Sequence, residues 1–229
     1  MNQDSFSFED FKGTVRLFPL PNLVLFPHVA QPLHIFEPRY RLMMADALED
    51  DRLLAMALLK PGWEKIYHKK PPIHPVICLG RILQEERLED GRYNLMLQGL
   101  CRARIQQELN LPKPYRVAQV ELFPDPPCDF DTEPLLRQQL ATQVVPFFSA
   151  HPPAMEQLQR LLKSALPLGA LCDIFSFALP FEIEVKQQLL EQFDIEKRVR
   201  LLLRSLEGCT PPVIKEVPRR RFPPEFSDN

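Results

Sequence analysis

The stretch VICLGRILQEERLEDGRYNLMLQGL, residues 76–100, decides the expected fold. Two runs rich in apolar residues, 76–86 and 92–100, flank the sequence LEDGRY. Asp90-Gly91 is a pair that readily adopts positive φ, so it favours a tight turn between antiparallel strands. We therefore predict a β-hairpin at the centre of a β-rich region.

Short β-type runs continue on both sides of this hairpin, up to about residue 123. Working outward, the further predicted strands cover residues 14–18, 29–35, 53–59, 101–109 and 115–123. The triplet Leu-Phe-Pro occurs twice. We expect Pro19 and Pro27 to end strands or to bound a loop, because proline has no N–H for a β ladder. Strands this short fit a small, strongly bent sheet.

One helix is expected inside the β region. The sequence EPRYRLMMADALED, residues 37–50, has an apolar face at helical spacing made of Tyr40, Met43, Met44, Ala47 and Leu48. Glu37 is favourable at the N-terminus of a helix and Pro38 in its first turn. We expect the apolar face to pack against the sheet.

The composition changes at PDPPCDFDTEP, residues 124–134, where prolines and acids predict a stiff, solvated connection. Beyond it the expected helices cover residues 133–149, 153–165, 168–179, 181–193 and 194–207. The predicted fold class is therefore α+β. The predicted organisation is a β domain, a Pro-rich linker, a helical subdomain and a disordered Pro-rich tail, over residues 1–123, 124–133, 134–208 and 209–229.

Composition narrows the possible functions. The 229 residues are 45% hydrophobic, enough for one large core or two small ones. With 28 basic and 30 acidic residues the net charge is -2, so no overall field attracts nucleic acid or a membrane surface. Seven glycines against 25 prolines disfavour Gly-rich phosphate loops. Five dispersed cysteines without a CxxC pair, and no apolar run of membrane-spanning length, indicate a reduced cytoplasmic protein.

Two segments carry a family resemblance. LFPLPNLVLFPHVAQPLHIFEPRY, residues 17–40, and CLGRILQEERLEDGRYNLMLQGLCRARI, residues 78–105, resemble the N-terminal substrate-binding domain of Lon-type ATP-dependent proteases. The helical segment LPFEIEVKQQLLEQFDIEKRVRLLLRSLE, residues 179–207, is similar to the helices that follow that domain. The resemblance covers about residues 13–207. It implies a PUA-like pseudo-barrel for the β half and a role in binding polypeptide substrates.

The sequence also departs from full-length Lon proteases. The 229 residues contain neither a G-x-x-x-x-G-K-[ST] phosphate loop nor the motif of a Ser-Lys protease. We therefore expect a stand-alone, non-enzymatic member with no catalytic residue, no metal and no cofactor. Its expected partners are unfolded or apolar polypeptide segments, in an adaptor or quality-control role, with an ATP-dependent protease as a further candidate partner. The oligomeric state stays open.

The candidate binding residues lie in two loops. The connection over residues 59–76 is long and carries the only tryptophan. Trp63, Ile66 and Tyr67 beside lysines are typical of binding anchors, although packing of this segment onto the barrel is an equal alternative. Phe26, in the loop that ends at Pro27, is a weaker candidate on the same grounds.

RNA binding is the alternative function, because PUA-like folds also occur in RNA-binding proteins. The basic features that could serve it are Lys65, His68, Lys69, Lys70, the strand pair Arg102 and Arg104, and residues 219–221. Acidic residues balance these charges overall, so nucleic acid is the less favoured partner. Cys101 beside Arg102 could be a reactive thiol, but a strand cysteine is more often an inert core residue.

Overall fold

The computed structural model describes residues 7–67, 69–127, 131–149 and 152–210. Its first half is β-rich and contains the strands β1 (Thr14–Leu20), β2 (Ala30–Ile35), β3 (Leu53–Leu58), β4 (Val76–Arg87), β5 (Tyr93–Leu109) and β6 (Arg116–Phe123). Helix α1 (Pro38–Leu48) and the 3₁₀ helices η1 (Phe8–Asp10) and η2 (Trp63–Ile66) lie in the same half.

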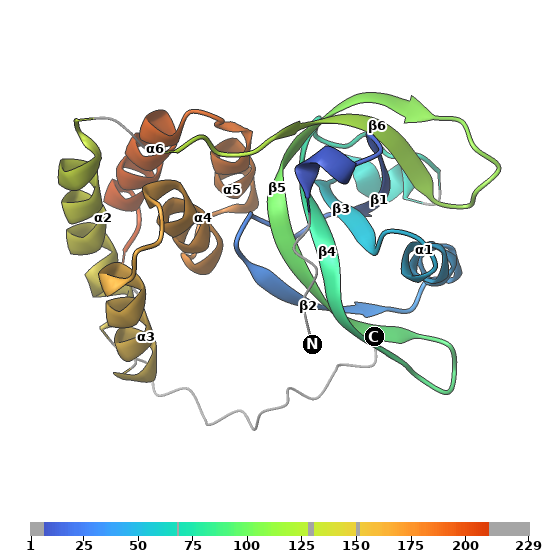
Figure 1. Cartoon of the computed structure of the whole chain (residues 1–229), viewed down its shortest axis with the longest axis horizontal. Coiled ribbons are helices and arrows are strands. Elements are labelled where there is room, and N and C mark those ends of the chain that lie inside the picture. Colours follow the sequence, from blue (N-terminus) through green and yellow to red (C-terminus); the bar gives the residue numbers. More distant parts are fainter. Residues whose placement is uncertain (1–6, 68, 128–130, 150–151, 211–229) are drawn as a thin grey trace.

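The second half is helical, with α2 (Glu133–Phe148), α3 (Pro152–Lys163), α4 (Leu168–Ala178), α5 (Ile183–Glu191) and α6 (Ile195–Glu207). The predicted α+β fold is confirmed, and the two halves lie side by side (Figure 1). The last strand ends at Phe123 and α2 begins at Glu133, where the composition changes. Of the predicted tail, only Cys209 and Thr210 belong to the described residues.

The strands close into a barrel. The sheet order is β2-β5-β4-β3-β1-β6, and β6 pairs again with β5, so five strands form a ring. Strand β5 makes this possible because its first part pairs with β2 and its second part with β6. Alternate residues of the ring strands fill the interior with small and medium side chains, among them Val15, Ala55, Ile77, Ala103 and Ala118.

The central hairpin differs from its prediction in two details. Residues 92–100 and 101–109, predicted as two strands, form the single strand β5, in which β-bulges supply the bend. In the turn only Gly91 has positive φ, at 81°, while the Gly91 N–H donates to the Leu88 carbonyl at 2.9 Å. The connection is thus a turn followed by one left-handed glycine rather than a two-residue loop.

The prolines end fewer strands than predicted. Pro19 lies inside β1 and pairs in register with Ala57 of β3. The expectation that it ends the strand was wrong, because β6 pairs only with residues Thr14 to Leu17 of β1. Beyond Leu17 the strand has a free side, where a missing N–H costs no ladder hydrogen bond. Pro27 lies in the connection between β1 and β2, as expected.

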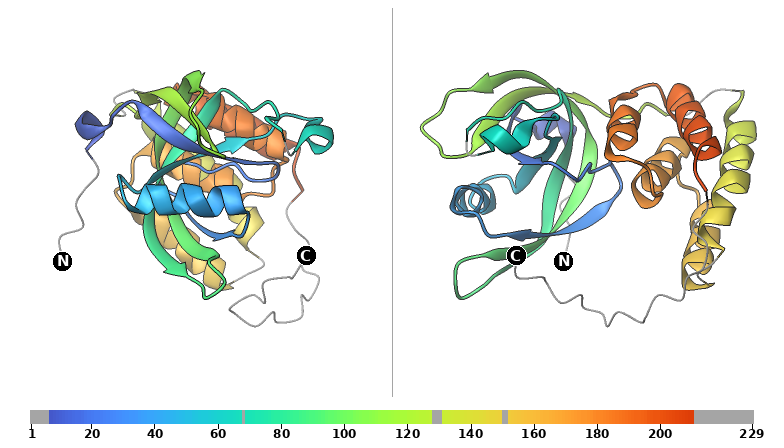
Figure 2. Two further views of the ribbon diagram at one scale, coloured as in Figure 1. Left: turned by 90° about the vertical axis from the view of Figure 1, so that its right-hand side faces the viewer. Right: turned by 180° about the vertical axis from the view of Figure 1, so that it is seen from behind.

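A second apolar core lies outside the ring. The predicted face of α1 is buried through Tyr40, Met43, Met44 and Ala47 and packs with residues of β2 to β5. The same cluster continues without a break into the apolar faces of the second-half helices. Seen from the side and from behind, α1 lies at the barrel end away from these helices (Figure 2). In the described part of the chain, no helix has both the length and the apolar character needed to cross a membrane.

Candidate functional site

Trp63, Ile66 and Tyr67 form a small ordered surface, which we call the Trp63 surface. Gly62, at φ 86°, turns the chain into η2, and Tyr67 follows η2 directly. All three side chains are half-buried. The rings of Trp63 and Tyr67 meet edge to face at 5.6 Å, and the Tyr67 hydroxyl donates to Glu37 at the start of α1. The predicted anchors are therefore held together and remain partly accessible.

Phe26 occupies a different environment. Its side chain is 0% exposed and belongs to the core cluster that includes α1. A fully buried ring offers no surface to a partner, so this position does not support the prediction that Phe26 contacts a polypeptide. The loop before β2 folds inward because Val24, Leu25 and Phe26 together supply apolar surface to the core.

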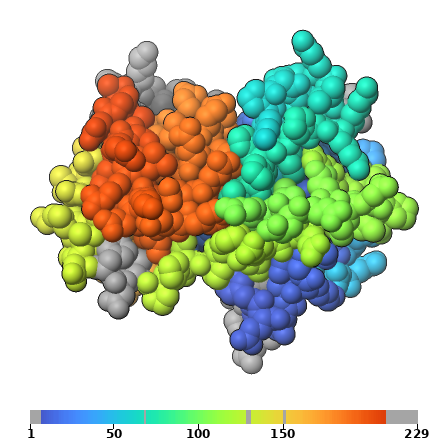
Figure 3. Space-filling model, turned by 90° about the horizontal axis from the view of Figure 1, so that it is seen from above, coloured from blue at the N-terminus to red at the C-terminus, as the bar shows by residue number. Residues whose placement is uncertain are grey.

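A small cleft of about 60 Å³ adjoins the Trp63 surface, and Tyr67 lines both. It lies between the start of α1, the segment after η2 and the beginning of β6. The lining side chains include Tyr40 and five cations but no acid, and the cations are Arg39, Lys69, Lys70, Lys113 and Arg116. We call it the basic cleft. Figure 3 shows the segments near residue 70 (turquoise) and residue 115 (green) on the barrel half, away from α2 and α6.

Buried charges connect the two halves of the molecule. Arg102 of β5 is 1% exposed and donates to both carboxylate oxygens of Asp173 in α4, at 2.8 and 2.5 Å. Its Nε donates to the Leu190 carbonyl at 3.0 Å. Burial acts to lower the pKa of Arg102, but Asp173 and Asp125 outweigh burial and raise it. This geometry fixes the barrel against α4 and α5.

Two further residues complete this arrangement, which we call the charge junction. Arg198 of α6 donates to Asp125 at 2.5 Å, and Asp125 lies 3.6 Å from Arg102. Two arginines and two aspartates thus balance. Gly169 lies beside them, and a Cβ there would lie 2.5 Å from Asp125 Oδ2, so a larger residue would displace this carboxylate. Asp125 falls in the segment predicted as a solvated connection; its side chain is 18% exposed, and its charge is partnered inside the junction.

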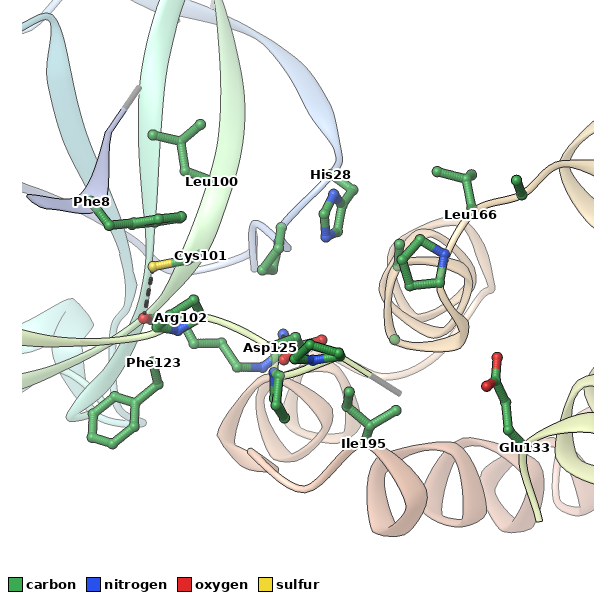
Figure 4. A pocket seen from close by; sticks show the side chains of 18 of the residues that line it. Phe8, His28, Leu100, Cys101, Arg102, Phe123, Asp125, Glu133, Leu166 and Ile195 are labelled. Carbon is green, nitrogen blue, oxygen red and sulfur yellow. Dashed lines mark hydrogen bonds and ion pairs between the residues drawn. The ribbon is translucent and has the colours of Figure 1, made fainter. Parts of the chain in front are cut away.

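A larger cavity of about 560 Å³ opens beside the charge junction, between the barrel and the helices. Figure 4 shows apolar side chains from both halves around it, with Arg102 and Asp125 between them. The apolar lining includes Phe8, Leu100, Phe123, Leu166 and Ile195. Glu133 and Arg137, also in the lining, pair with each other at 3.1 Å. We call it the interdomain cavity, and its lining suits an apolar side chain.

The buried thiols Cys78, Cys101 and Cys172 are not set up as nucleophiles. Burial raises the pKa of Cys101 to about 12, and Arg102 only partly opposes this. Burial also raises the pKa of Cys172 to about 12. Reactive cysteines need the opposite shift. Within the described ranges, no group of three His, Cys, Asp or Glu residues could hold a metal ion.

Comparison with known proteins assigns the family. The model of the ATP-dependent protease La (LON) substrate-binding domain matches residues 14–208. The chain belongs to the Lon substrate-binding family. The Lon protease of Desulfosudis oleivorans is 25% identical over 193 residues, which are 84% of this chain and 24% of that protease. Lon protease 2 of Herpetosiphon aurantiacus is 30% identical over 189 residues, or 81% of this chain and 23% of that protein.

Solved Lon domains share the fold. The N-terminal domain of the Mycobacterium avium complex Lon protease has a TM-score of 0.67 at 19% identity, with coverage of 85% of this chain and 98% of that one. A Lon N-terminal domain protein from Xanthomonas campestris has a TM-score of 0.60 at 22% identity, with coverage of 83% and 97%. The chain spans about a quarter of the length of the Lon proteases that it matches in sequence.

The fold separates the basic residues that the sequence offered as candidates for RNA binding. Arg102 and Arg104 share one face of β5, yet Arg102 is buried in the charge junction while Arg104 is exposed. Arg104 lies over the rings of Phe123 and Phe193, at 5.1 and 5.0 Å from the ring centres. Arg102 is therefore not accessible to a phosphate backbone, whereas Arg104 remains at the surface. His68 and residues 219–221 lie outside the described residues.

The charge junction and the basic cleft were not found from the sequence. Their residues come from segments far apart in the chain, and no spacing rule connects Arg102 with Asp173 or Tyr40 with Arg116. One signal was present but ambiguous: a charged residue inside an apolar helical stripe, such as Asp173 in LGALCDIFSFA, indicates a buried partner. The identity of that partner depends on how the helices pack against the barrel.

Proposed function

We propose that this Lon substrate-binding domain is a polypeptide-binding module that recognises unfolded or apolar segments and performs no chemistry itself. The observation that carries the proposal is the family match over residues 14–208. Neither a phosphate loop nor a Ser-Lys protease motif occurs in the 229 residues.

The Trp63 surface is the proposed contact for apolar side chains. Partly accessible aromatic rings that are already held in place lose little conformational freedom on binding. Trp and Tyr also combine a large apolar area with a polar atom, which suits recognition of varied sequences. The interdomain cavity is the competing location, because it is apolar and lies between the two halves.

The proposed cellular role is that of an adaptor or quality-control factor, with an ATP-dependent protease as its partner. We place it in the cytoplasm. Reduced thiols at Cys78, Cys101 and Cys172 are buried in the structure, and such packing persists where thiols are kept reduced.

Binding to an unfolded polypeptide tests the proposal. The probe is a reduced, alkylated polypeptide that stays unfolded, with its native form as the comparison, and the readout is fluorescence anisotropy. We expect binding of the unfolded form only. Trp63→Ala should weaken it by about 1 to 3 kcal/mol, since aromatic anchors commonly contribute that much. Melting temperatures measured on the same preparations show whether any loss follows from unfolding.

Two further variants separate the candidate surfaces. Leu135→Ala is the matched control, because this leucine is 55% exposed on α2, far from the Trp63 surface, and should leave binding unchanged. Leu166→Ala tests the interdomain cavity. A larger loss with Leu166→Ala than with Trp63→Ala would move the contact into that cavity. Equal binding of folded and unfolded probe would refute the proposed function.

A further inference from the structure

Tyr40 packs its ring in the core, but the core supplies no hydrogen-bond partner for its hydroxyl. Its side chain is 4% exposed, and its ring packs edge to face on Phe18 at 4.7 Å. Among the described residues, none forms a hydrogen bond with the Tyr40 hydroxyl, although the side chain lines the basic cleft. The hydroxyl is not itself enclosed by the protein, so it is open to the cleft and can donate to an acceptor that enters there.

The groups around this hydroxyl are mostly cationic. The Arg39 guanidinium lies 4.6 Å from the centre of the Tyr40 ring and 5.0 Å from that of Tyr67. Burial raises the pKa of Tyr40 well above its ordinary value; Arg39 and Arg116 act in the opposite direction, and Glu37 and Tyr67 add to the rise. The phenol therefore keeps its proton at neutral pH and can donate a hydrogen bond to an acceptor in the cleft.

The basic cleft has more positive charge than its neighbours neutralise. Three of its cations have carboxylate partners: Arg39 pairs with Glu37 at 2.9 Å, Lys113 pairs with Asp46 at 2.7 Å, and Arg116 pairs with Glu108. Lys69 and Lys70 are exposed and form no ion pair with any other described residue. The net charge of the chain is -2, so these two unpaired lysines are a local excess of positive charge at the basic cleft.

We infer that the basic cleft is a carboxylate-binding subsite for polypeptides. The Tyr40 hydroxyl donates a hydrogen bond to the carboxylate, Lys69 and Lys70 supply complementary charge, and the adjoining Trp63 surface contacts apolar residues next to the bound group. The cleft, of about 60 Å³, has room for a carboxylate. The inference rests on the proposed function, since it specifies the chemistry of the polypeptide.

The carboxylate can come from a polypeptide C-terminus or from an Asp or Glu side chain, and a peptide series distinguishes the two. The probes are a Leu- and Phe-rich peptide, labelled at its N-terminus, with a free C-terminal carboxylate, with a C-terminal amide, and with the amide plus one internal Asp. The 229-residue protein is titrated with each by fluorescence anisotropy. We expect carboxylate-bearing peptides to bind about tenfold more tightly than the amide, as for a charge-assisted hydrogen bond.

Tyr40→Phe is the decisive variant, because it removes the hydroxyl and keeps the packed ring. It should abolish the difference between carboxylate and amide peptides, whereas Tyr93→Phe, another buried barrel tyrosine outside the cleft, should preserve it. A second variant, Lys69→Gln with Lys70→Gln, should weaken the carboxylate peptides alone. Lys163→Gln with Lys197→Gln removes the same charge from exposed helical positions and serves as its control.

The outcomes separate this inference from the proposed function. Equal binding of all three peptides, or a carboxylate preference that survives Tyr40→Phe, would overturn the subsite and leave polypeptide binding intact. Failure of every peptide and of the unfolded polypeptide would overturn both. Single-stranded poly-U binding that competes with the peptides and disappears in Tyr40→Phe would assign the cleft to RNA instead. Preference for the free C-terminus over the internal Asp, or the reverse, identifies the source of the carboxylate.

Discussion

The charge junction and the basic cleft both contain cationic side chains, but the two regions differ in whether those charges are buried and paired. At the junction, Arg102 and Arg198 are almost fully buried, and each faces an aspartate within 3 Å. At the cleft, Lys69 and Lys70 are exposed and Tyr40 has a donor without an acceptor. Paired, desolvated charges fix a geometry, whereas unpaired charges beside a cleft leave an interaction to be completed from outside. The fold places aspartates against the arginines of the junction, whereas no described carboxylate pairs with Lys69 or Lys70.

Breaking the junction should have the largest effect on stability. Asp173→Asn keeps the side-chain shape but leaves two buried arginines short of one negative charge. We expect the free energy of unfolding to fall by about 3 to 5 kcal/mol, as for other broken buried pairs. Urea denaturation measures it.

The control for this variant is Glu196→Gln, which removes an exposed pair with Arg200 on α6. It should cost less than about 1 kcal/mol. If the two variants lose similar stability, the junction is not the structural contact that its burial indicates.

The rate of thiol labelling measures how often the charge junction opens, because two buried cysteines lie next to its residues. Cys101 precedes Arg102 and Cys172 precedes Asp173, and burial raises the pKa of both thiols to about 12. At pH 8 their labelling should be slower than that of an ordinary thiol by on the order of a thousandfold, because the thiolate is the reactive form. Mass spectrometry of the labelled peptides measures each rate.

In Asp173→Asn the labelling of Cys172 should accelerate, since the junction opens more often. Cys209, which is partly exposed, is the internal reference and should label at the same rate in both proteins. Rapid labelling of Cys101 and Cys172 in the unaltered protein would show that the two halves separate readily.

The sequence predicted the elements better than their contacts. Local patterns were sufficient for α1 and for the hairpin, because spacing, capping and a turn glycine act within a few residues. They failed where a distant segment decided the outcome. Pro19 stays inside β1 because β6 pairs only up to Leu17, and the bend of β5 depends on its pairing with both β2 and β6.

The same limit applies to the candidate sites. Sequence spacing correctly put Tyr40 on the buried face of α1, but the direction of its hydroxyl depends on the segments that surround the basic cleft. Phe26 was a weaker binding candidate because it lies in the loop that ends at Pro27, yet it packs with its apolar neighbours in the core. Arg102 and Arg104 look equivalent in sequence, and only the position of α4 and α5 distinguishes them.

Arg104 provides an intermediate case between the two regions. It is exposed, but its guanidinium lies over Phe123 of the barrel and Phe193 of the helical half. Arg104→Ala should cost about 0.5 to 2 kcal/mol of unfolding free energy, which is the range for cation–π contacts. Arg104→Lys, measured in the same urea series, should recover only part of it, because a planar guanidinium stacks better than an ammonium. Full recovery would mean that charge alone matters at this contact.

The smallest effect is expected at the edge of the basic cleft, where Asp46 pairs with Lys113 at 2.7 Å and accepts a hydrogen bond from Tyr115. Slight burial acts to raise the pKa of Asp46, but the hydrogen bonds from Lys113 and Tyr115 outweigh it and lower the pKa. A lowered folded-state pKa stabilises the protein above the unfolded value of about 3.9, and this contribution is lost as the pH falls through the folded pKa. Asp46→Asn should therefore cost at most about 1 kcal/mol at pH 7, and progressively less as the pH falls below the unfolded value.

The same variant connects stability with binding, because Asp46 neutralises one of the cleft's cations. If the basic cleft binds carboxylates, Asp46→Asn should tighten binding of the carboxylate peptide at pH 7, by no more than about fivefold, while the amide peptide is unaffected. Glu207→Gln, which removes an exposed carboxylate at the end of α6, should change neither quantity. Stability and affinity thus move in opposite directions only if Lys113 becomes available to the ligand. A parallel loss of both would mean that Asp46 holds the cleft in shape, and that its charge does not limit what binds there.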